Sequence, residues 1–144
     1  MIGNVDLDLL EKTYQNASIG ITALKAVMDK VENREMNKEL HQQLRDYREI
    51  ANKSKEQLIA NGTKVKEQSF YTRSIMKGNV KLNILMRPTD SSIAQMVIQG
   101  STMGVTQMTK LIHAKKNADG VSTDIAKDFV KKEEKNIETM KKYL

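Results

Sequence analysis

The feature that most constrains this chain is a run without charge, from Ser91 to Thr109, in a sequence otherwise crowded with Lys, Glu and Asp. Such a run can form about five turns of α-helix, and a helix without a charged face must be covered on more than one side. Ser, Thr and Gln make up nearly half of the run, whereas membrane insertion favours Leu, Ile, Val and Phe. It is therefore predicted to be an inner helix of a bundle and not to enter a membrane.

The composition favours one helical domain covering residues 1–144. Lys, Glu, Met and Leu are plentiful, while Pro and aromatic residues are rare, which is typical of helical bundles. The absence of Cys excludes disulfides, iron–sulfur clusters and Cys-containing zinc sites. The N-terminal residues are acidic and no basic segment precedes an apolar run, so no secretory signal is predicted and a cytoplasmic location is expected.

Three further segments show apolar residues in steps of three and four, the period of an amphipathic helix. They run from Leu7 to Val31, from Met36 to Leu58, and from Ala126 to Leu144. With the uncharged run, they predict four long helices. The predicted end signals are Asn61-Gly62 after the second helix, Thr89, Asp90 or Ser91 as N-cap of the third, and Ser122 or Thr123 as N-cap of the fourth.

A connection of about 28 residues, Thr63 to Asp90, separates the second and third helices. It is too long for a tight turn, so we expect it to cross the full length of the bundle. Its segment Val80 to Ile84 alternates like a strand, but a lone strand would have no partner in this sequence. The connection is therefore predicted to be partly helical, with a kink near Gly78.

The net charge of +6 does not indicate a nucleic-acid partner. The cations are spread along the chain and interleaved with Glu and Asp, and no recognition motif accompanies them. No phosphate-binding glycine loop is expected either, because Gly100 and Gly104 lie within a helix. Their spacing indicates close approach of a neighbouring helix.

The sequence also contains a faint internal repeat. A shift of 84 positions places residues 18–22 on 102–106 and Glu49 on Glu133. If the repeat is real, the first two helices are a structural copy of the last two. Only a few positions match, so chance similarity is the alternative.

Two helical hairpins joined by a long crossover resemble the ferritin-like four-helix fold. The segments 16–22, 93–104 and 138–144 resemble an uncharacterised ferritin-like branch that is common in anaerobic Gram-positive bacteria. The resemblance implies an all-α, up-down four-helix bundle with a crossover between its second and third helices. It implies no particular activity, because one fold serves many functions.

The carboxylates that a di-iron ferritin-like site needs are missing from two helices. Such a site takes one Glu from each of two helices and a Glu-x-x-His motif from each of the other two. The first helix has no acidic residue between Glu11 and Asp29, and the third has none between Asp90 and Asp119. Half of the expected ligand set is therefore absent.

The two histidines do not complete the set. His41 and His113 each follow a Lys by three residues, so no Glu-x-x-His motif exists. The predicted topology places them at opposite ends of the bundle, and each is interpreted as a surface residue. No resident metal or other cofactor is expected.

Glu133 is the carboxylate of greatest interest, because it lies on the apolar stripe of the fourth helix. Burying a carboxylate costs several kcal/mol unless it is paired, so an inward Glu133 needs a partner. Tyr47, Lys135 or a core hydroxyl such as Thr102 could supply it. The alternative is a Glu at the edge of the stripe that reaches water.

The favoured hypothesis is a non-catalytic bundle that acts by association, as a homodimer or larger homo-oligomer. The candidate interface on the third helix consists of Ile98, Ser101, Val105 and Ile112. One alternative is a degenerate metal-binding or oxidoreductase-type protein that uses Glu49 and Glu133. A second alternative, from resemblance alone, is a spore-coat or stress-associated structural protein.

Overall fold

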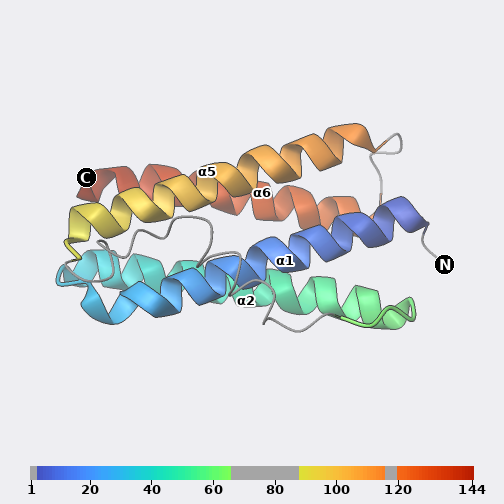
Figure 1. Ribbon diagram of the computed structural model, residues 1–144, viewed down its shortest axis with the longest axis horizontal. Helices are drawn as coiled ribbons and strands as arrows, with labels where there is room; N and C mark the ends of the chain where they lie inside the picture. The colour runs from blue at the N-terminus through green and yellow to red at the C-terminus, as the bar shows by residue number, and fades with distance from the viewer. Residues whose placement is uncertain (1–2, 66–87, 116–119) are drawn as a thin grey trace.

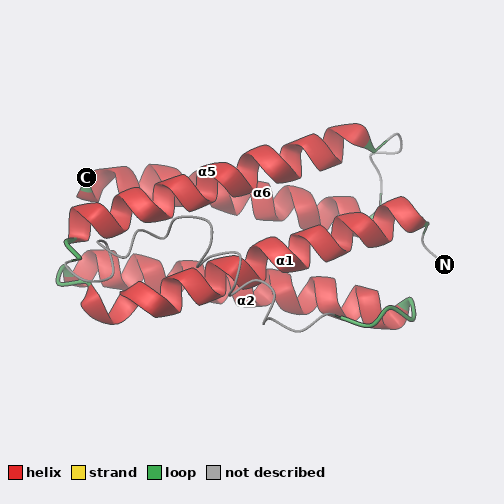
Figure 2. Ribbon diagram, in the orientation of Figure 1, coloured by secondary structure: helices red, strands yellow, loops and turns green. Residues whose placement is uncertain are grey.

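A computed structural model describes residues 3–65, 88–115 and 120–144. These residues form four long α-helices and two short 3-10 segments (Figure 1). In chain order the elements are α1 (Asn4–Val27), η1 (Met28–Lys30), α2 (Arg34–Ala60), α5 (Asp90–Ala114), α6 (Val121–Met140) and η2 (Lys141–Tyr143). The described part of the chain contains no β-strand (Figure 2). The fold is thus an all-α four-helix bundle, as predicted.

The bundle consists of two antiparallel hairpins, α1 with α2 and α5 with α6, and the helices within each hairpin pack most extensively. The α6 helix also packs against α1 and α2, and α5 against α1. The end of α2 and the start of α5 lie at opposite ends of the bundle, so their connection spans its length, as expected (Figure 1). The helix predicted in this connection, with its kink near Gly78, lies outside the described residues.

Local sequence signals set several helix ends. The α2 helix stops at Asn61, and Gly62 follows with a φ of 77°, a backbone conformation that favours glycine. At the start of α5, the side chain of Thr89 accepts from the backbone N–H of Ser92, and the Ser92 hydroxyl accepts from the backbone N–H of Thr89. This capping box selects Thr89 from the three predicted caps.

The predicted cap of α6 is wrong. Its N-cap is Gly120, with a φ of 116°, and no side chain caps the helix. Ser122 and Thr123 are buried within the first turn, and their hydroxyl groups contact Lys115 from the end of α5. Neither can be the N-cap, because the helix has already begun at Val121.

The uncharged run has two different faces. Its inner face belongs to the shared core through buried residues such as Ile93, Val97 and Met108. Its opposite face is exposed. The prediction that the run is covered on more than one side is therefore not met within one chain. None of the described helices is long and apolar enough to span a membrane.

Candidate functional site

The middle of the core contains a polar pair formed by Tyr47 from α2 and Glu133 from α6. The Tyr47 hydroxyl donates a hydrogen bond to Oε1 of Glu133, whose residue surface is only 3% exposed. The same oxygen accepts from Nδ2 of Asn136 at 3.0 Å and from Oγ of Ser101 at 3.4 Å. Glu133 is therefore paired inside the bundle, and donors from three helices surround one carboxylate oxygen.

This arrangement decides between the two environments that the sequence left open for Glu133. Of the partners considered, Tyr47 and a core hydroxyl are both present, whereas Lys135 is exposed. The core hydroxyl is that of Ser101 and not that of Thr102, which is exposed and donates to the backbone carbonyl of Ile98 at 2.7 Å. Asn136, which lies one helical turn after Glu133, was not predicted as a partner.

Burial changes the ionisation of both members of the pair. Loss of solvation raises the pKa of Glu133, although hydrogen bonds from Tyr47, Asn136 and Ser101 act in the opposite direction. Burial, together with the nearby Glu133 carboxylate, raises the pKa of Tyr47 well above that of an ordinary tyrosine. Tyr47 therefore remains a hydrogen-bond donor at neutral pH, and the pair can fix how α2, α5 and α6 are aligned.

Two glycines make room for the pair. A Cβ atom on Gly20 of α1 would lie 2.7 Å from the ring of Tyr47. A Cβ atom on Gly104 of α5 would lie 2.9 Å from Oε2 of Glu133 and 3.4 Å from the ring of Phe129. The two glycines correspond under the 84-residue shift, and each borders one member of the pair.

The role predicted for the glycines of α5 needs correction. Gly104 accommodates a carboxylate and an aromatic ring, and not the backbone of a neighbouring helix. At Gly100 a Cβ atom would meet nothing within 4 Å. Among the described residues, Gly104 alone of the two therefore has side chains packed where its Cβ atom would lie.

The other residues considered for metal binding do not join Glu133. Glu49 lies on the outer side of α2, where it forms an ion pair with Lys53 at 2.9 Å that lowers its pKa. His41 and His113 are exposed, as interpreted from the sequence. Within the described ranges, no group of three or more His, Cys, Asp or Glu residues is placed to hold a metal ion.

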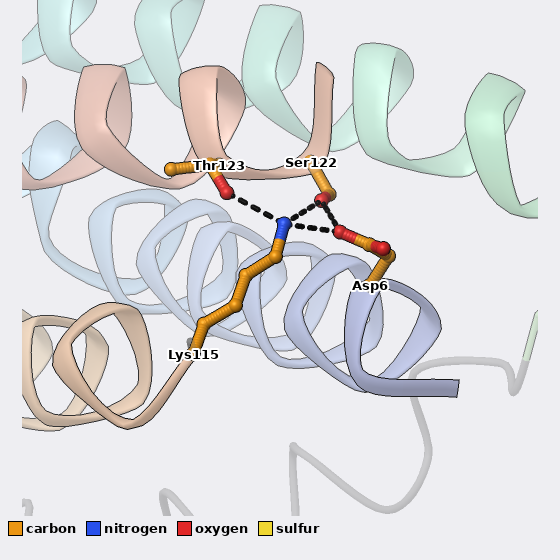
Figure 3. A network of polar contacts seen from close by, with 4 residues as sticks. All are labelled: Asp6, Lys115, Ser122 and Thr123. Carbon is orange, nitrogen blue, oxygen red and sulfur yellow. Dashed lines mark hydrogen bonds and ion pairs between the residues drawn. The ribbon is translucent and has the colours of Figure 1, made fainter. Parts of the chain in front are cut away.

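A second polar cluster, which sequence reasoning missed, joins three helix ends (Figure 3). Lys115, at the end of α5, forms an ion pair with Asp6 in the first turn of α1. Its Nζ atom also lies 2.8 Å from Oγ1 of Thr123 and 3.3 Å from Oγ of Ser122, both in the first turn of α6. Ser122 in turn donates to Asp6, and the Lys115 side chain is only 6% exposed.

A serine beside a lysine can form a nucleophilic pair, but only if the lysine can accept a proton. Here the ion pair with Asp6 requires the ammonium form of Lys115, which has no lone pair for that task. Lys115 and Ser122 together hold the pKa of Asp6 below its usual value. We therefore interpret this cluster as a structural latch between α1, α5 and α6.

The structure divides the predicted interface residues. Ser101 is only 2% exposed and contacts Glu133 inside the bundle, so its assignment to an interface is wrong. Ile98, Val105 and Ile112 are half-buried. They recur every seven residues and so lie along one edge of α5. Their role in association stays a prediction.

Comparison with known proteins identifies the fold only. No family model matches the chain, and no curated protein matches it. A solved structure, the crystal structure of a DUF305 fragment from Deinococcus radiodurans, matches with a TM-score of 0.71 and 11% sequence identity. The match covers 97% of this chain and 95% of that chain. The protein thus shares an all-α four-helix fold with the DUF305 fragment over nearly its whole length.

Proposed function

We propose that this chain is a non-catalytic ferritin-like bundle that acts by association with a second copy of itself. The observation that carries the proposal is the exposed side of α5, which we call the α5 outer face. Within the uncharged run it consists of Gln95, Gln99, Thr102, Met103 and Thr106, all of them exposed, and the exposed Lys110 follows one turn after Thr106.

The α5 outer face differs from the exposed surface of the other long helices in carrying no charge. The exposed side of α2, for example, carries Arg45, Glu49 and Lys53. A chain with a net charge of +6 repels a second copy of itself, and this repulsion is weakest where no charge is present. The centre of a protein interface is likewise depleted in charged residues and enriched in Met. Met103 is 73% exposed.

The three half-buried residues predicted from the sequence extend this surface. Ile98, Val105 and Ile112 lie along one edge of α5, and Thr102 lies between that edge and the centre of the outer face. A second copy bound to α5 would cover both this edge and the α5 outer face. The proposed interface therefore keeps three of the four predicted residues and adds Met103 and Thr106.

Membership of the ferritin-like branch of anaerobic Gram-positive bacteria and a structural role in a spore coat or stress response are supported by the resemblance in sequence. A cytoplasmic location is proposed as the default. A coat or stress-associated component would need self-association to assemble. The metal-binding alternative gains no support, because Glu49 and Glu133 lie in different surroundings.

Size-exclusion chromatography with light scattering tests the proposal. The wild-type chain should be a dimer or larger at micromolar concentration. The double variant Met103→Lys/Thr106→Lys adds two cations to the α5 outer face without removing a buried group, and it should be a monomer. Ile59→Lys is the matched control, because Ile59 is an exposed apolar residue, 59% accessible, on α2.

A wild-type chain that is monomeric at these concentrations would contradict the proposal. An oligomer that both sets of variants leave intact would place the interface elsewhere. Circular dichroism on each variant separates loss of association from loss of fold.

A further inference from the structure

The outer surface between α1 and α2 is hollowed into a groove that the proposed self-association does not use. Its lining comprises Tyr14, Ser18, Ile21 and Lys25 from α1, and Arg48, Ala51, Asn52 and Lys55 from α2. We call this surface the α1–α2 groove. Ser18, Ile21 and Ala51 are almost fully buried and form a largely apolar floor.

Three cations line this groove without partners among the described residues. Lys25, Arg48 and Lys55 make no ion pair or hydrogen bond with any of them, and no described carboxylate lines the groove. By contrast, Lys53 of α2 pairs with Glu49 at 2.9 Å. The groove is therefore a local concentration of unpaired positive charge above an apolar floor.

The cations are spread along the groove and do not converge on one point. Arg48 and Lys55 are separated by two helical turns, or about 10 Å, on one face of α2. Gly20 faces Tyr47, and Nδ2 of Asn37 donates to the carbonyl of Met28, which fixes the antiparallel register of α1 and α2. This register places Lys25 about another two turns beyond Arg48. The row is about 20 Å long, which suits an elongated ligand better than a single small anion.

We propose that the α1–α2 groove binds an acidic amphipathic helix of a partner protein. A helix with a carboxylate at every seventh residue repeats its charge at about 10 Å, the same interval as the cations. Aliphatic side chains between the carboxylates would contact the floor at Ile21 and Ala51, as in other helix-in-groove complexes. Unpaired cations along the rim complement the charge of such a helix.

A single-stranded nucleic acid is the main competing polyanion. Its binding rests on aromatic side chains that stack with successive bases. The floor contains the aliphatic Ile21 and Ala51 beside Ser18, and Tyr14 alone is aromatic among the described residues that line the groove. The groove therefore favours peptide side chains over bases.

Fluorescence anisotropy with the full chain tests the inference. The probe is a labelled helical peptide of about 18 residues, long enough to span the three cations, with Glu at every seventh position and Leu between. The double variant Arg48→Glu/Lys55→Glu should weaken binding by about tenfold or more, because two attractive contacts become repulsive. The control Lys131→Glu/Lys135→Glu makes the same change in net charge on exposed residues of α6, and its affinity should stay within about twofold of wild type.

Several results would overturn the inference. One is equal weakening by the groove and α6 variants, which would indicate attraction by net charge alone. Another is equal binding of a peptide with Gln in place of Glu, or no binding of the acidic peptide. Tighter binding of an oligothymidylate of equal charge would assign the groove to nucleic acid. The Met103→Lys/Thr106→Lys variant should still bind the peptide, so failure of the proposed self-association remains distinguishable.

Discussion

Tyr47 and Glu133 show how hydrogen bonds from neighbouring helices can satisfy a carboxylate in the core of a bundle. Burial of a charged group is unfavourable, and each donor to Glu133 offsets part of that cost. Two of the donors come from helices other than α6, so the hydrogen bonds also constrain how the helices are aligned. We therefore expect the pair to specify how the helices are aligned more than to add a large free energy of stabilisation.

Two substitutions at this pair should have different effects on the free energy of unfolding. Tyr47→Phe removes the Tyr47 hydroxyl that donates to the Glu133 carboxylate, and we expect the free energy of unfolding to fall by about 1–3 kcal/mol. Glu133→Gln removes a buried charge while keeping an acceptor for Tyr47, and it should be nearly neutral or stabilising at pH 7. Urea unfolding of both variants measures this difference. A larger loss for Glu133→Gln than for Tyr47→Phe would contradict the account.

The pH dependence of the Glu133→Gln effect follows from the sign of the pKa shift. The pKa of Glu133 is raised in the folded state from a reference of 4.5, so folding favours the protonated carboxyl. Stability from this group is therefore fully present below pH 4.5 and is lost as the pH rises through the folded pKa. Relative to wild type, Glu133→Gln should gain stability over this interval. A constant difference between the two proteins at all pH values would argue against a buried, titrating Glu133.

Gly100 and Gly104 provide a matched pair within α5. Gly104→Ala forces a Cβ atom to 2.9 Å from Oε2 of Glu133, and such overpacking typically costs about 1–3 kcal/mol. The Cβ atom of Gly100→Ala would meet no atom of the described residues within 4 Å, and this substitution should stabilise the helix by about 0.5–1 kcal/mol. Thermal unfolding should therefore shift in opposite directions for the two variants. A shift in the same direction would show that the carboxylate is not held against Gly104.

At the scale of the elements, the helices were largely predictable, because their apolar periods and several end signals are local in sequence. Asn61-Gly62 and Thr89 act where the sequence placed them. The predicted cap of α6 was wrong because the helix begins before Ser122 and Thr123, which contact Lys115, and this contact depends on how three helices meet. Ser101 and Asn136 were missed as partners of Glu133 because these contacts also depend on how the helices pack.

The latch that joins α1, α5 and α6 has a pH dependence opposite to that of Glu133. The pKa of Asp6 is lowered in the folded state from 3.8, so its contribution to stability is present above pH 3.8 and is lost as the pH falls through the folded pKa. Asp6→Asn should therefore destabilise the protein at pH 7 and have little effect at pH values below that folded pKa. Urea unfolding across this range measures the change, with the exposed Asp8→Asn as a control. Equal effects of the two substitutions at pH 7 would rule out the latch.

At the scale of the whole molecule, the bundle separates its surfaces by charge. The exposed sides of α2 and α6 carry most of the helical charge, the α1–α2 groove gathers unpaired cations, and the α5 outer face carries no charge. The sequence showed that the run from Ser91 to Thr109 was uncharged, but not that half of it faces outward. That distinction depends on where the other three helices lie.

A distance measurement between two copies tests the central claim, association through α5, most directly. The chain has no cysteine, so Thr106→Cys introduces one unique site for a nitroxide spin label in the centre of the α5 outer face. Pulsed electron paramagnetic resonance should detect dipolar coupling between labels on two copies, and the matched Ile59→Cys label on α2 should give weaker coupling at a longer distance. Coupling that is absent for Thr106→Cys, or stronger for Ile59→Cys, would contradict association through α5.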